Sequence, residues 1–360
     1  MKPKEPTAII CLSPYHGGME MDAIRTARLL QDYSEITVIL KKGSPSENHY
    51  RKTLEQDGLS VSTISFHTAF SLSIIFQVRK LIRNNRIRNV IFFGSSELRS
   101  LFFAFLGLNI NLAIRHGTTK SRSKKDPIHQ LIYRHVRWHI AICKHIASNV
   151  KSIIPFGPRT QLRIIYPSLR HNPTFQHRTT DTTRPLRIVH VSRVTGGKGH
   201  IDAIEACKVI ADNGRAFELL FIGEIDAAFK HIIDTKLSNL PYSENIRLEG
   251  FVPNPIRILE TADIFLFPSH GEGLSNAFIE ALAQGLPCVA YNNTSFPELA
   301  ELGFRLWLAS DRNTTDLQEK LLNAIAYLDT HKKYIRENHD LAISLFSITR
   351  ETHDYLSILQ

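Results

Sequence analysis

The sequence predicts an α/β fold of two domains, each a doubly wound parallel sheet with helices on both faces. The chain has 360 residues, more than one hydrophobic core normally supports. Short apolar runs alternate with helical periodicity in both halves, which is typical of parallel sheets. Residues 168–185 lack this periodicity and are rich in Thr and Pro. We expect domains at 1–170 and 186–345, a linker at 171–185 and a C-terminal helix at 346–360.

Apolar runs mark the expected strands and helical periodicity marks the expected helices. In the first half the strands are 7–12, 36–40, 61–66, 90–93, 111–114, 139–143 and 163–166. In the second half they are 186–191, 218–223, 246–251, 263–267 and 289–291. The main expected helices are 19–33, 128–138, 201–212, 315–328, 331–346 and 348–359. Ligands of such sheets bind beyond the carboxyl ends of the strands, so the loops there are the places to seek a site.

Charge is distributed unevenly along the chain. Residues 1–180 hold 27 Lys and Arg against 10 Asp and Glu, whereas residues 181–360 hold 17 against 24. The basic first half therefore predicts an anionic partner. Nucleic acid would suit the high pI, but no nucleic-acid-binding motif is present and the second half is acidic. We expect no nucleic-acid partner.

The cysteines and the apolar runs bear on the compartment. Cys11, Cys143, Cys207 and Cys288 are widely spaced in apolar runs, which indicates reduced, packed thiols rather than disulfides or a zinc site. No apolar run reaches about 18 residues, and the first residues turn polar too soon for a signal peptide. These features predict a cytoplasmic protein.

The stretch 268–288, PSHGEGLSNAFIEALAQGLPC, carries the strongest functional signal. It reads as a strand end, a loop and a helix capped by Ser275 or Asn276, so free amides at the helix start suit a diphosphate. Glu272 lies in the loop, and Glu280 lies one turn inside the helix on the same face as Asn276. Carboxylates repel phosphate and favour hydroxyl groups, so the pair suits a nucleotide sugar. The alternative is that both are ordinary loop and helix residues.

The letters EGLSNAFIEALAQGLP resemble the E-x7-E signature of family 4 of the retaining glycosyltransferases, which have the GT-B fold. The resemblance covers the C-terminal half and extends more weakly to the N-terminal half. It implies two Rossmann-like domains facing across a cleft. It also implies that Glu272 orients donor-sugar hydroxyls and that Glu280 holds the ribose. The donor-binding residues implied are Gly17, Gly18, Phe251, Val252, Gly273, Leu274, Ser275, Asn276 and Glu280.

Two cations follow the first strand of the second half. Arg193 and Lys198, in SRVTGGKGH, resemble the family's diphosphate-binding pair and would stabilise a leaving diphosphate without a metal. The chain also lacks a D-x-D triplet, the metal-binding feature of the other major glycosyltransferase fold. We expect no metal and no other cofactor. The letters FIGEI depart from the family's G-x-G because Ile225 replaces the second glycine, which puts phosphate contact at that loop in doubt.

The first half supplies a glycine-rich loop and a histidine. SPYHGGME, with Gly17 and Gly18, resembles the loop that lies over the donor diphosphate in family 4. His116, in AIRHGTTK, follows a strand where the family commonly has a histidine that contacts the donor sugar. The alternative is a histidine satisfied within the core or a loop. We carry His116 forward with Glu272, Arg193 and Lys198 as catalytic candidates.

Basic residues follow His116. Arg115, Lys120, Arg122, Lys124 and Lys125 form either a cradle for acceptor phosphates or carboxylates, or a solvated, mobile loop. The helix expected at 128–138 mixes apolar with basic residues. It fits an anionic membrane surface, although its spacing fits the domain core equally well, and we favour the core.

The sequence therefore predicts a retaining, metal-independent glycosyltransferase that uses a nucleoside-diphosphate sugar, with a UDP-sugar favoured. The expected acceptor is an anionic glycan or glycolipid of lipopolysaccharide core or surface polysaccharide, with peripheral contact to the inner membrane as a further option. Two alternatives stay open. One is a catalytically silent nucleotide-sugar-binding partner of another transferase, and the other is a GT-B epimerase or hydrolase.

Overall fold

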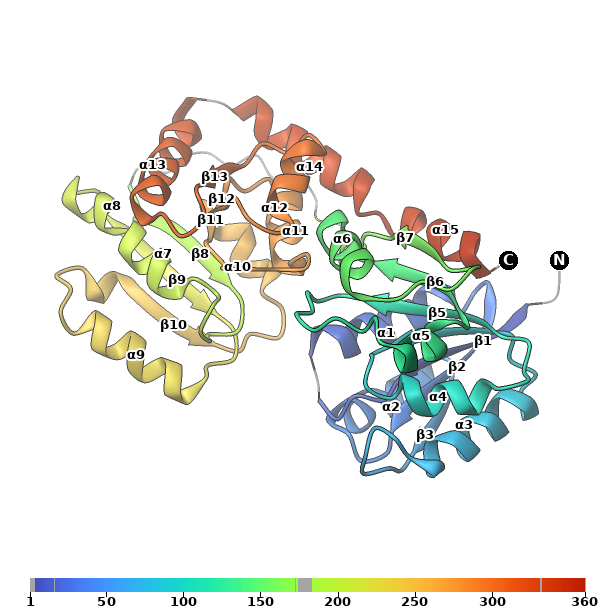
Figure 1. The fold of residues 1–360 in the computed structure, drawn as a ribbon. Coiled ribbons are helices and arrows are strands. Elements are labelled where there is room, and N and C mark those ends of the chain that lie inside the picture. Colours follow the sequence, from blue (N-terminus) through green and yellow to red (C-terminus); the bar gives the residue numbers. More distant parts are fainter. Residues whose placement is uncertain (1–3, 16, 172, 174–182, 331, 360) are drawn as a thin grey trace. The chain divides into compact units, whose positions relative to one another are not determined.

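The structure is a computed structural model that describes residues 4–15, 17–171, 173, 183–330 and 332–359. It divides the chain into two compact units (Figure 1). Unit 1 comprises Met1–Tyr166 and Ile348–Gln360, and unit 2 comprises Pro167–Ser347. The first crossing between units thus comes at 166/167, four residues before the expected domain end. Most of the expected linker lies outside the described residues.

Unit 1 is built on a parallel sheet of seven strands. These are β1 (Glu5–Cys11), β2 (Ser34–Lys41), β3 (Ser60–Ile64), β4 (Asn89–Phe93), β5 (Asn111–His116), β6 (Val136–Ala141) and β7 (Gln161–Ile164). Their order in the sheet is β3-β2-β1-β4-β5-β6-β7. The helices are α1 (Gly18–Leu30), α2 (Pro45–Gln56), α3 (Leu72–Asn84), α4 (Leu98–Phe105), α5 (Pro127–Tyr133), α6 (Lys144–Ile153) and α15 (Ile348–Leu359). The central strands β1 and β4 are mostly apolar and buried because helices cover both faces of the sheet.

Unit 2 repeats the plan with six parallel strands. These are β8 (Leu186–Val191), β9 (Phe217–Ile222), β10 (Ile246–Gly250), β11 (Ile264–Phe267), β12 (Cys288–Tyr291) and β13 (Trp307–Ala309), in the order β10-β9-β8-β11-β12-β13. Its helices are α7 (His200–Ala206), α8 (Lys208–Asp212), α9 (Ala227–Leu237), α10 (Ile256–Thr261), α11 (Asn276–Ala283), α12 (Phe296–Glu301), α13 (Thr314–Thr330) and α14 (Lys332–Leu345). The predicted fold class of two doubly wound parallel sheets is confirmed.

Two predicted helices differ from the structure, and one strand was not predicted. The helix expected at 128–138 ends at Tyr133, because Val136 already begins β6 and Trp138 pairs with Ala113 of β5. The helix expected at 201–212 is two helices that meet at Cys207. Strand β13 was not predicted, since three residues are too few to show a period.

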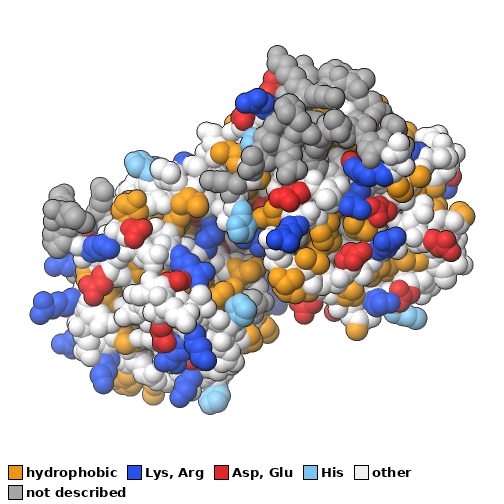
Figure 2. Space-filling view, turned by 180° about the vertical axis from the view of Figure 1, so that it is seen from behind, with side chains coloured by type: hydrophobic (Ala, Val, Ile, Leu, Met, Phe, Trp, Pro, Cys, Tyr) orange, Lys and Arg blue, Asp and Glu red, His pale blue; other side chains and the backbone are white. Residues whose placement is uncertain are grey.

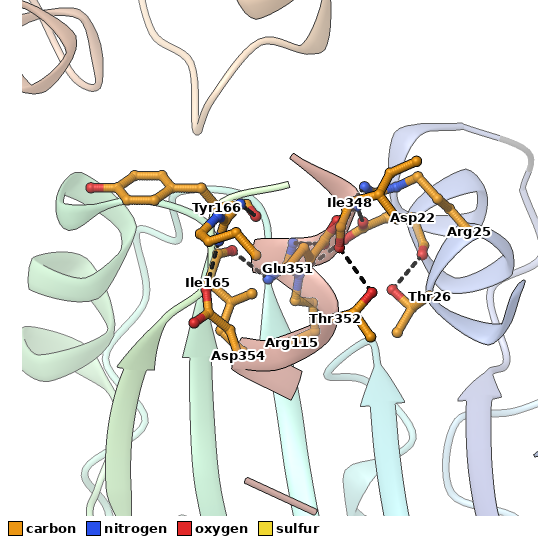
Figure 3. Close-up of polar contacts among 11 residues, drawn as sticks. Asp22, Arg25, Thr26, Arg115, Ile165, Tyr166, Ile348, Glu351, Thr352 and Asp354 are labelled. Atoms are coloured by element: carbon orange, nitrogen blue, oxygen red, sulfur yellow. Dashed lines mark hydrogen bonds and ion pairs between the residues drawn. The ribbon is translucent and has the colours of Figure 1, made fainter. Parts of the chain in front are cut away.

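Helix α15 is held on unit 1 by a buried ionic network (Figure 3). Arg115 of β5 donates through Nε to Asp22 of α1 at 3.0 Å and through Nη1 to the Ile165 carbonyl at 2.7 Å. Arg25 of α1 donates to both oxygens of Glu351, at 2.6 and 3.0 Å. The Glu351 side chain is fully buried, and its Oε1 lies 3.8 Å from Arg115 Nη2. These charges tie the end of the chain to the centre of the sheet.

The network changes the interpretation of Arg115. Its side chain is 2% exposed and its guanidinium is committed to Asp22, Ile165 and Glu351. Arg115 also lines a cavity of unit 1, so its acceptor contact stays a prediction, although its charge is paired within the core of that unit. Sequence spacing gave no sign of this, since Glu351 lies more than two hundred positions away.

We expect Glu351→Ala to destabilise the protein by about 3–5 kcal/mol, because it removes one of the two carboxylates, Glu351 and Asp22, that neutralise Arg25 and Arg115. Burial would raise the pKa of Asp22, but Arg115 and Arg25 outweigh it and hold that pKa below its ordinary value. The Asp22 contribution is thus fully present above the unfolded pKa of about 4 and is lost as the pH falls through the lower folded value. Urea unfolding at pH 7 and pH 3 measures both effects. His353→Ala, exposed on the same helix, is the control and should cost under about 0.5 kcal/mol.

Candidate active site

Three loops converge at the carboxyl edge of the unit 2 sheet: 192–199 after β8, 268–275 after β11 and 292–295 after β12. The His270 amide donates to the Gly197 carbonyl at 3.0 Å. The Glu272 amide donates to Thr294 Oγ1 at 3.1 Å. Backbone and side-chain bonds between loops thus fix the position of Glu272 relative to both neighbouring strands.

Two glycines make this convergence possible. Gly199 has φ +76°, and a Cβ placed there would lie 1.9 Å from the Pro268 carbonyl oxygen. Gly223 has φ +149°, and its Cβ would lie 2.0 Å from the Ser192 carbonyl oxygen. Ile225, which replaces the expected second glycine, pairs with Val194 in a parallel bridge and packs on the core. That position therefore serves packing between the β8 and β9 loops.

Lys198 and Glu272 form an ion pair at the centre of these loops. Lys198 Nζ donates to Glu272 Oε1 at 2.6 Å, and Ser269 Oγ donates to the same oxygen at 3.0 Å. Their side chains are 25% and 14% exposed, so the pair lies at a partly solvated surface. Arg193 lies exposed in the same loop as Lys198. The structure thus brings two of the predicted catalytic residues into direct contact.

Helix α11 begins beside Glu272. Ser275 is its N-cap, and its Oγ accepts from the Phe278 amide at 3.3 Å. Leu274 is buried, whereas Asn276 is exposed at the helix start. The second carboxylate, Glu280, is buried at 3% exposure. It accepts both arms of a fork from Arg170, a residue that sequence reasoning missed.

The remaining donor-site candidates of unit 2 follow β10. Phe251 is 74% exposed and Val252 is half-buried. They lie at the same carboxyl edge, two strands away from β8. An exposed aromatic side chain there offers a flat apolar surface next to the loops that hold Lys198 and Glu272.

Unit 1 has a cavity of about 250 Å³ at the carboxyl ends of β1, β4 and β5. The predicted residues Arg115, His116 and Lys120 line it, together with Ser13, Tyr15, Met19 and Glu97. Glu97 was not predicted, and burial raises its pKa. Gly17 and Gly18 begin α1 beside this cavity wall, and a Cβ at Gly18 would meet nothing within 4 Å.

His116 is buried beside a second histidine. Its Nε2 is hydrogen-bonded to His139 Nδ1 at 3.0 Å, and its own Nδ1 has no partner within the described part of the chain. Burial, with the charges of His139 and Lys120, lowers the pKa of His116 well below its usual range. The imidazole is therefore neutral at pH 7. Burial also lowers the pKa of Lys120 to about 8.

The basic segment after His116 is pinned to α6. Lys120 exchanges two hydrogen bonds with the Asn149 side chain, and the Lys124 amide donates to the Ile153 carbonyl at 2.8 Å. Arg122 and Lys125 are exposed. The alternative of a freely mobile loop does not fit these bonds. Basic side chains predominate on the face of unit 1 drawn in Figure 2.

Helix α5, which follows this segment, is amphipathic with part of its apolar surface outward. Ile132 and Tyr133 are buried, but Ile128 is 61% and Leu131 is 52% exposed. The preferred assignment of this helix to the core is thus correct for only one face. Within the described ranges, the structure contains no helix with the length and apolarity needed to cross a membrane.

A family model described as glycosyl transferases group 1 matches residues 174–340. The match lies within unit 2 and covers just under half of the chain. The Lys198–Glu272 pair and the start of α11 lie within the matched residues. The chain is 37% identical over 149 residues to the amylovoran biosynthesis glycosyltransferase AmsK of Erwinia amylovora, covering 39% of this chain and 36% of the relative. It is 30% identical over 188 residues to the putative colanic acid biosynthesis glycosyltransferase WcaL of Escherichia coli K12, covering 49% and 46%. The matches thus span less than half the length of these relatives.

Solved structures resemble the whole chain, including the residues that the family model matches. A glycosyltransferase from Rickettsia africae aligns over 99% of both chains with a TM-score of 0.82 at 16% identity. Anabaena Alr3699/HepE in complex with UDP aligns over 99% of both chains with a TM-score of 0.78 at 16% identity. The chain therefore has the GT-B fold, two Rossmann-like units, as the sequence predicted.

We expect Gly199→Ala to cost more than about 4 kcal/mol, because a Cβ at 1.9 Å from a carbonyl oxygen forces the backbone apart. Gly197→Ala is the matched control. Gly197 has nearly the same φ, +79°, with nothing near its Cβ, so only the 1–2 kcal/mol or so of left-handed strain remains. Urea unfolding of both variants measures the difference. Equal losses would contradict the close approach of the two loops.

Proposed function

We propose that the protein is a retaining, metal-independent glycosyltransferase that moves a sugar from a nucleoside-diphosphate sugar, a UDP-sugar first among them, to an acceptor hydroxyl. The observation that carries this proposal is the Lys198–Glu272 ion pair beside the start of α11. It places a cation, a carboxylate and free helix amides within one group of loops. The names of AmsK and WcaL, which refer to amylovoran and colanic acid biosynthesis, support a role in polysaccharide assembly, and lipopolysaccharide core is a further acceptor that we propose to test. The UDP bound to Anabaena HepE supports the donor class.

Lys198 and Arg193 supply positive charge for the departing diphosphate. As the bond from the anomeric carbon to the phosphate oxygen breaks, negative charge grows on that oxygen, and fixed cations stabilise the growing charge. The acceptor oxygen then bonds to the anomeric carbon on the same face, and its proton passes to the departing phosphate oxygen. The configuration is retained. The two cations carry the charge stabilisation that a divalent metal would otherwise supply, so no metal is needed.

Glu272 orients hydroxyls of the donor sugar, and Glu280 accepts from the ribose. The amides of 273–276 lie where the helix dipole favours the diphosphate. Phe251 and Val252 would contact the base. Gly17 and Gly18 are further donor-binding candidates in unit 1, and a Cβ at Gly18 would meet nothing within 4 Å. His116, neutral and with Nδ1 unpartnered among the described residues, can donate one hydrogen bond to a sugar hydroxyl without adding charge.

Thermal shift across UDP-, GDP- and ADP-sugars, followed by transfer to deacylated lipopolysaccharide core, tests the proposal. One nucleotide family should stabilise the protein, and its sugar should appear on the acceptor. Stabilisation without transfer to core or to envelope extract would indicate a silent nucleotide-sugar-binding partner. Free sugar or an epimer formed without acceptor would indicate a hydrolase or epimerase. Absence of any stabilisation would overturn the donor site.

We expect Glu280→Ala to raise the donor dissociation constant at least about tenfold, or about 1.4 kcal/mol. Lys198→Ala should lower the rate of transfer about 10²-fold or more, since its charge acts mainly on the departing phosphate. Isothermal titration with UDP and initial rates of transfer measure the two effects. Lys208→Ala is the control, because Lys208 pairs with Asp212 on exposed α8 and should change neither. Unchanged donor binding in Glu280→Ala would reject the ribose contact.

The acceptor is proposed to be an anionic glycan or glycolipid held by unit 1. Lys120 lines the cavity, and Arg122, Lys124 and Lys125 follow it. Replacing these four residues by Gln should raise the acceptor KM about tenfold and leave donor binding unchanged. Rates at varied acceptor concentration measure this effect, and an unaltered KM would reject the cradle.

The outward Ile128 and Leu131 beside these cations support peripheral contact with the inner membrane. Co-sedimentation with phosphatidylglycerol vesicles measures that contact, and its absence at low salt would reject it.

A further inference from the structure

Glu280 is already bound by a side chain in this structure. Arg170 Nε donates to Glu280 Oε1 at 2.5 Å, and Arg170 Nη2 donates to Oε2 at 2.8 Å. The Glu280 side chain is 3% exposed, whereas that of Arg170 is 38% exposed. A carboxylate buried to this degree needs a partner, and a two-pronged guanidinium is the partner that best matches its plane. Both residues belong to unit 2, so the contact is internal to one unit.

With the Arg170 fork in place, each Glu280 oxygen can still accept one further hydrogen bond. A carboxylate offers about four lone-pair positions, and Arg170 uses one on each oxygen. One acceptor position therefore remains on each of Oε1 and Oε2. The fork approaches both oxygens from the same side, so the remaining positions point away from each other, to the two sides of the carboxylate. A single hydroxyl of a sugar can donate to one of them. Arg170 and one ribose hydroxyl can thus bind the same carboxylate together, and neither needs to displace the other.

Arg170 is itself held in place by the backbone next to it. The Leu169 amide donates to the Phe346 carbonyl at 2.9 Å. Residue 169 lies just after the first crossing of the chain between units, and residue 346 lies just before the second crossing. The base of the Arg170 side chain is therefore anchored between the two crossing segments. This anchorage fixes where the guanidinium fork meets α11.

Resting on the proposed function of Glu280, we propose that Arg170 is a positioning residue for donor binding. It holds the plane of the Glu280 carboxylate so that one remaining lone pair faces a ribose hydroxyl. The fork also supplies the counter-charge that a buried carboxylate needs. Arg170 does not touch the donor and acts only through Glu280. Without the fork, Glu280 is free to rotate and its oxygens no longer face the ribose.

The test compares binding of UDP and 2′,3′-dideoxy-UDP to the full chain by isothermal titration. The wild type should bind UDP about tenfold or more tightly than the dideoxy analogue, since the hydrogen bond from the ribose to Glu280 is lost in the analogue. In Arg170→Ala this preference should fall to about twofold or less, while binding of the dideoxy analogue changes little. Arg170→Lys keeps the charge but lacks the fork, so it should restore only part of the preference.

Arg184→Ala is the matched control. Arg184 makes the same two-pronged contact with Asp263, at 2.8 and 2.7 Å, and its side chain is 37% exposed. Asp263 precedes β11, so this pair lies at the opposite end of the strand from the donor loops. Arg184→Ala should therefore keep the full preference for UDP. It also reports what the loss of a similar ion pair does to unit 2 in general.

The outcomes separate this inference from the proposed function. If the wild type does not bind UDP, or binds both nucleotides equally, the ribose role of Glu280 itself fails. If the wild type prefers UDP and Arg170→Ala keeps that preference, the positioning role is overturned. Tighter UDP binding in Arg170→Ala would also overturn it, because Arg170 would then compete with the ribose. Equal loss of preference in Arg184→Ala and Arg170→Ala would reduce the effect to general destabilisation.

Discussion

The candidate donor site depends on the close approach of Gly199 to the Pro268 carbonyl oxygen. No residue with a Cβ fits between the two loops at this point. The contact brings the end of the β8 loop against the start of the β11 loop, and Lys198 and Glu272 lie on either side of it. Neither loop has regular structure, so the site gains its definition from this contact and from the hydrogen bonds among the loops. A backbone constraint thus determines where the charged side chains meet.

In unit 1 the corresponding constraint acts on α15, which is far in the sequence from the rest of that unit. Apolar packing alone would let α15 slide along the sheet, because hydrophobic contact is not directional. The Arg25–Glu351 fork and the nearby Arg115–Asp22 pair supply direction. Such buried charges cost desolvation energy, so they are weak evidence for added stability. These charges instead determine where α15 lies along the sheet, because only one position of the helix places Glu351 beside both Arg25 and Arg115.

The sequence was sufficient to locate twelve of the strands and to single out Glu272 and Glu280, but not to find the partners of those glutamates. Apolar runs located these strands because most of them are buried and short. Periodicity could not place the end of α5, since the apolar residues of β6 continue its pattern after Tyr133. The Glu272 loop carries a local spacing that can be recognised. Arg170 and Arg115 have no such local spacing. Arg170 pairs with Glu280 and Arg115 lies near Glu351, and each partner is 110 or more positions away in the sequence. Cation-to-carboxylate pairing of this kind is decided by the fold.

Both carboxylates of the candidate donor site are neutralised by protein cations, yet the two arrangements differ in a way that matters for chemistry. Lys198 is a single flexible ammonium, and it shares Glu272 Oε1 with Ser269. It can turn toward a phosphate oxygen while Glu272 keeps a hydrogen bond from Ser269. Arg170 is a rigid fork that holds both oxygens of a buried carboxylate. The first pair is suited to moving charge during a reaction, and the second to holding a carboxylate still. In the proposed function, the lysine at Glu272 would serve the reacting end of a nucleotide sugar and the arginine at Glu280 the end that only binds.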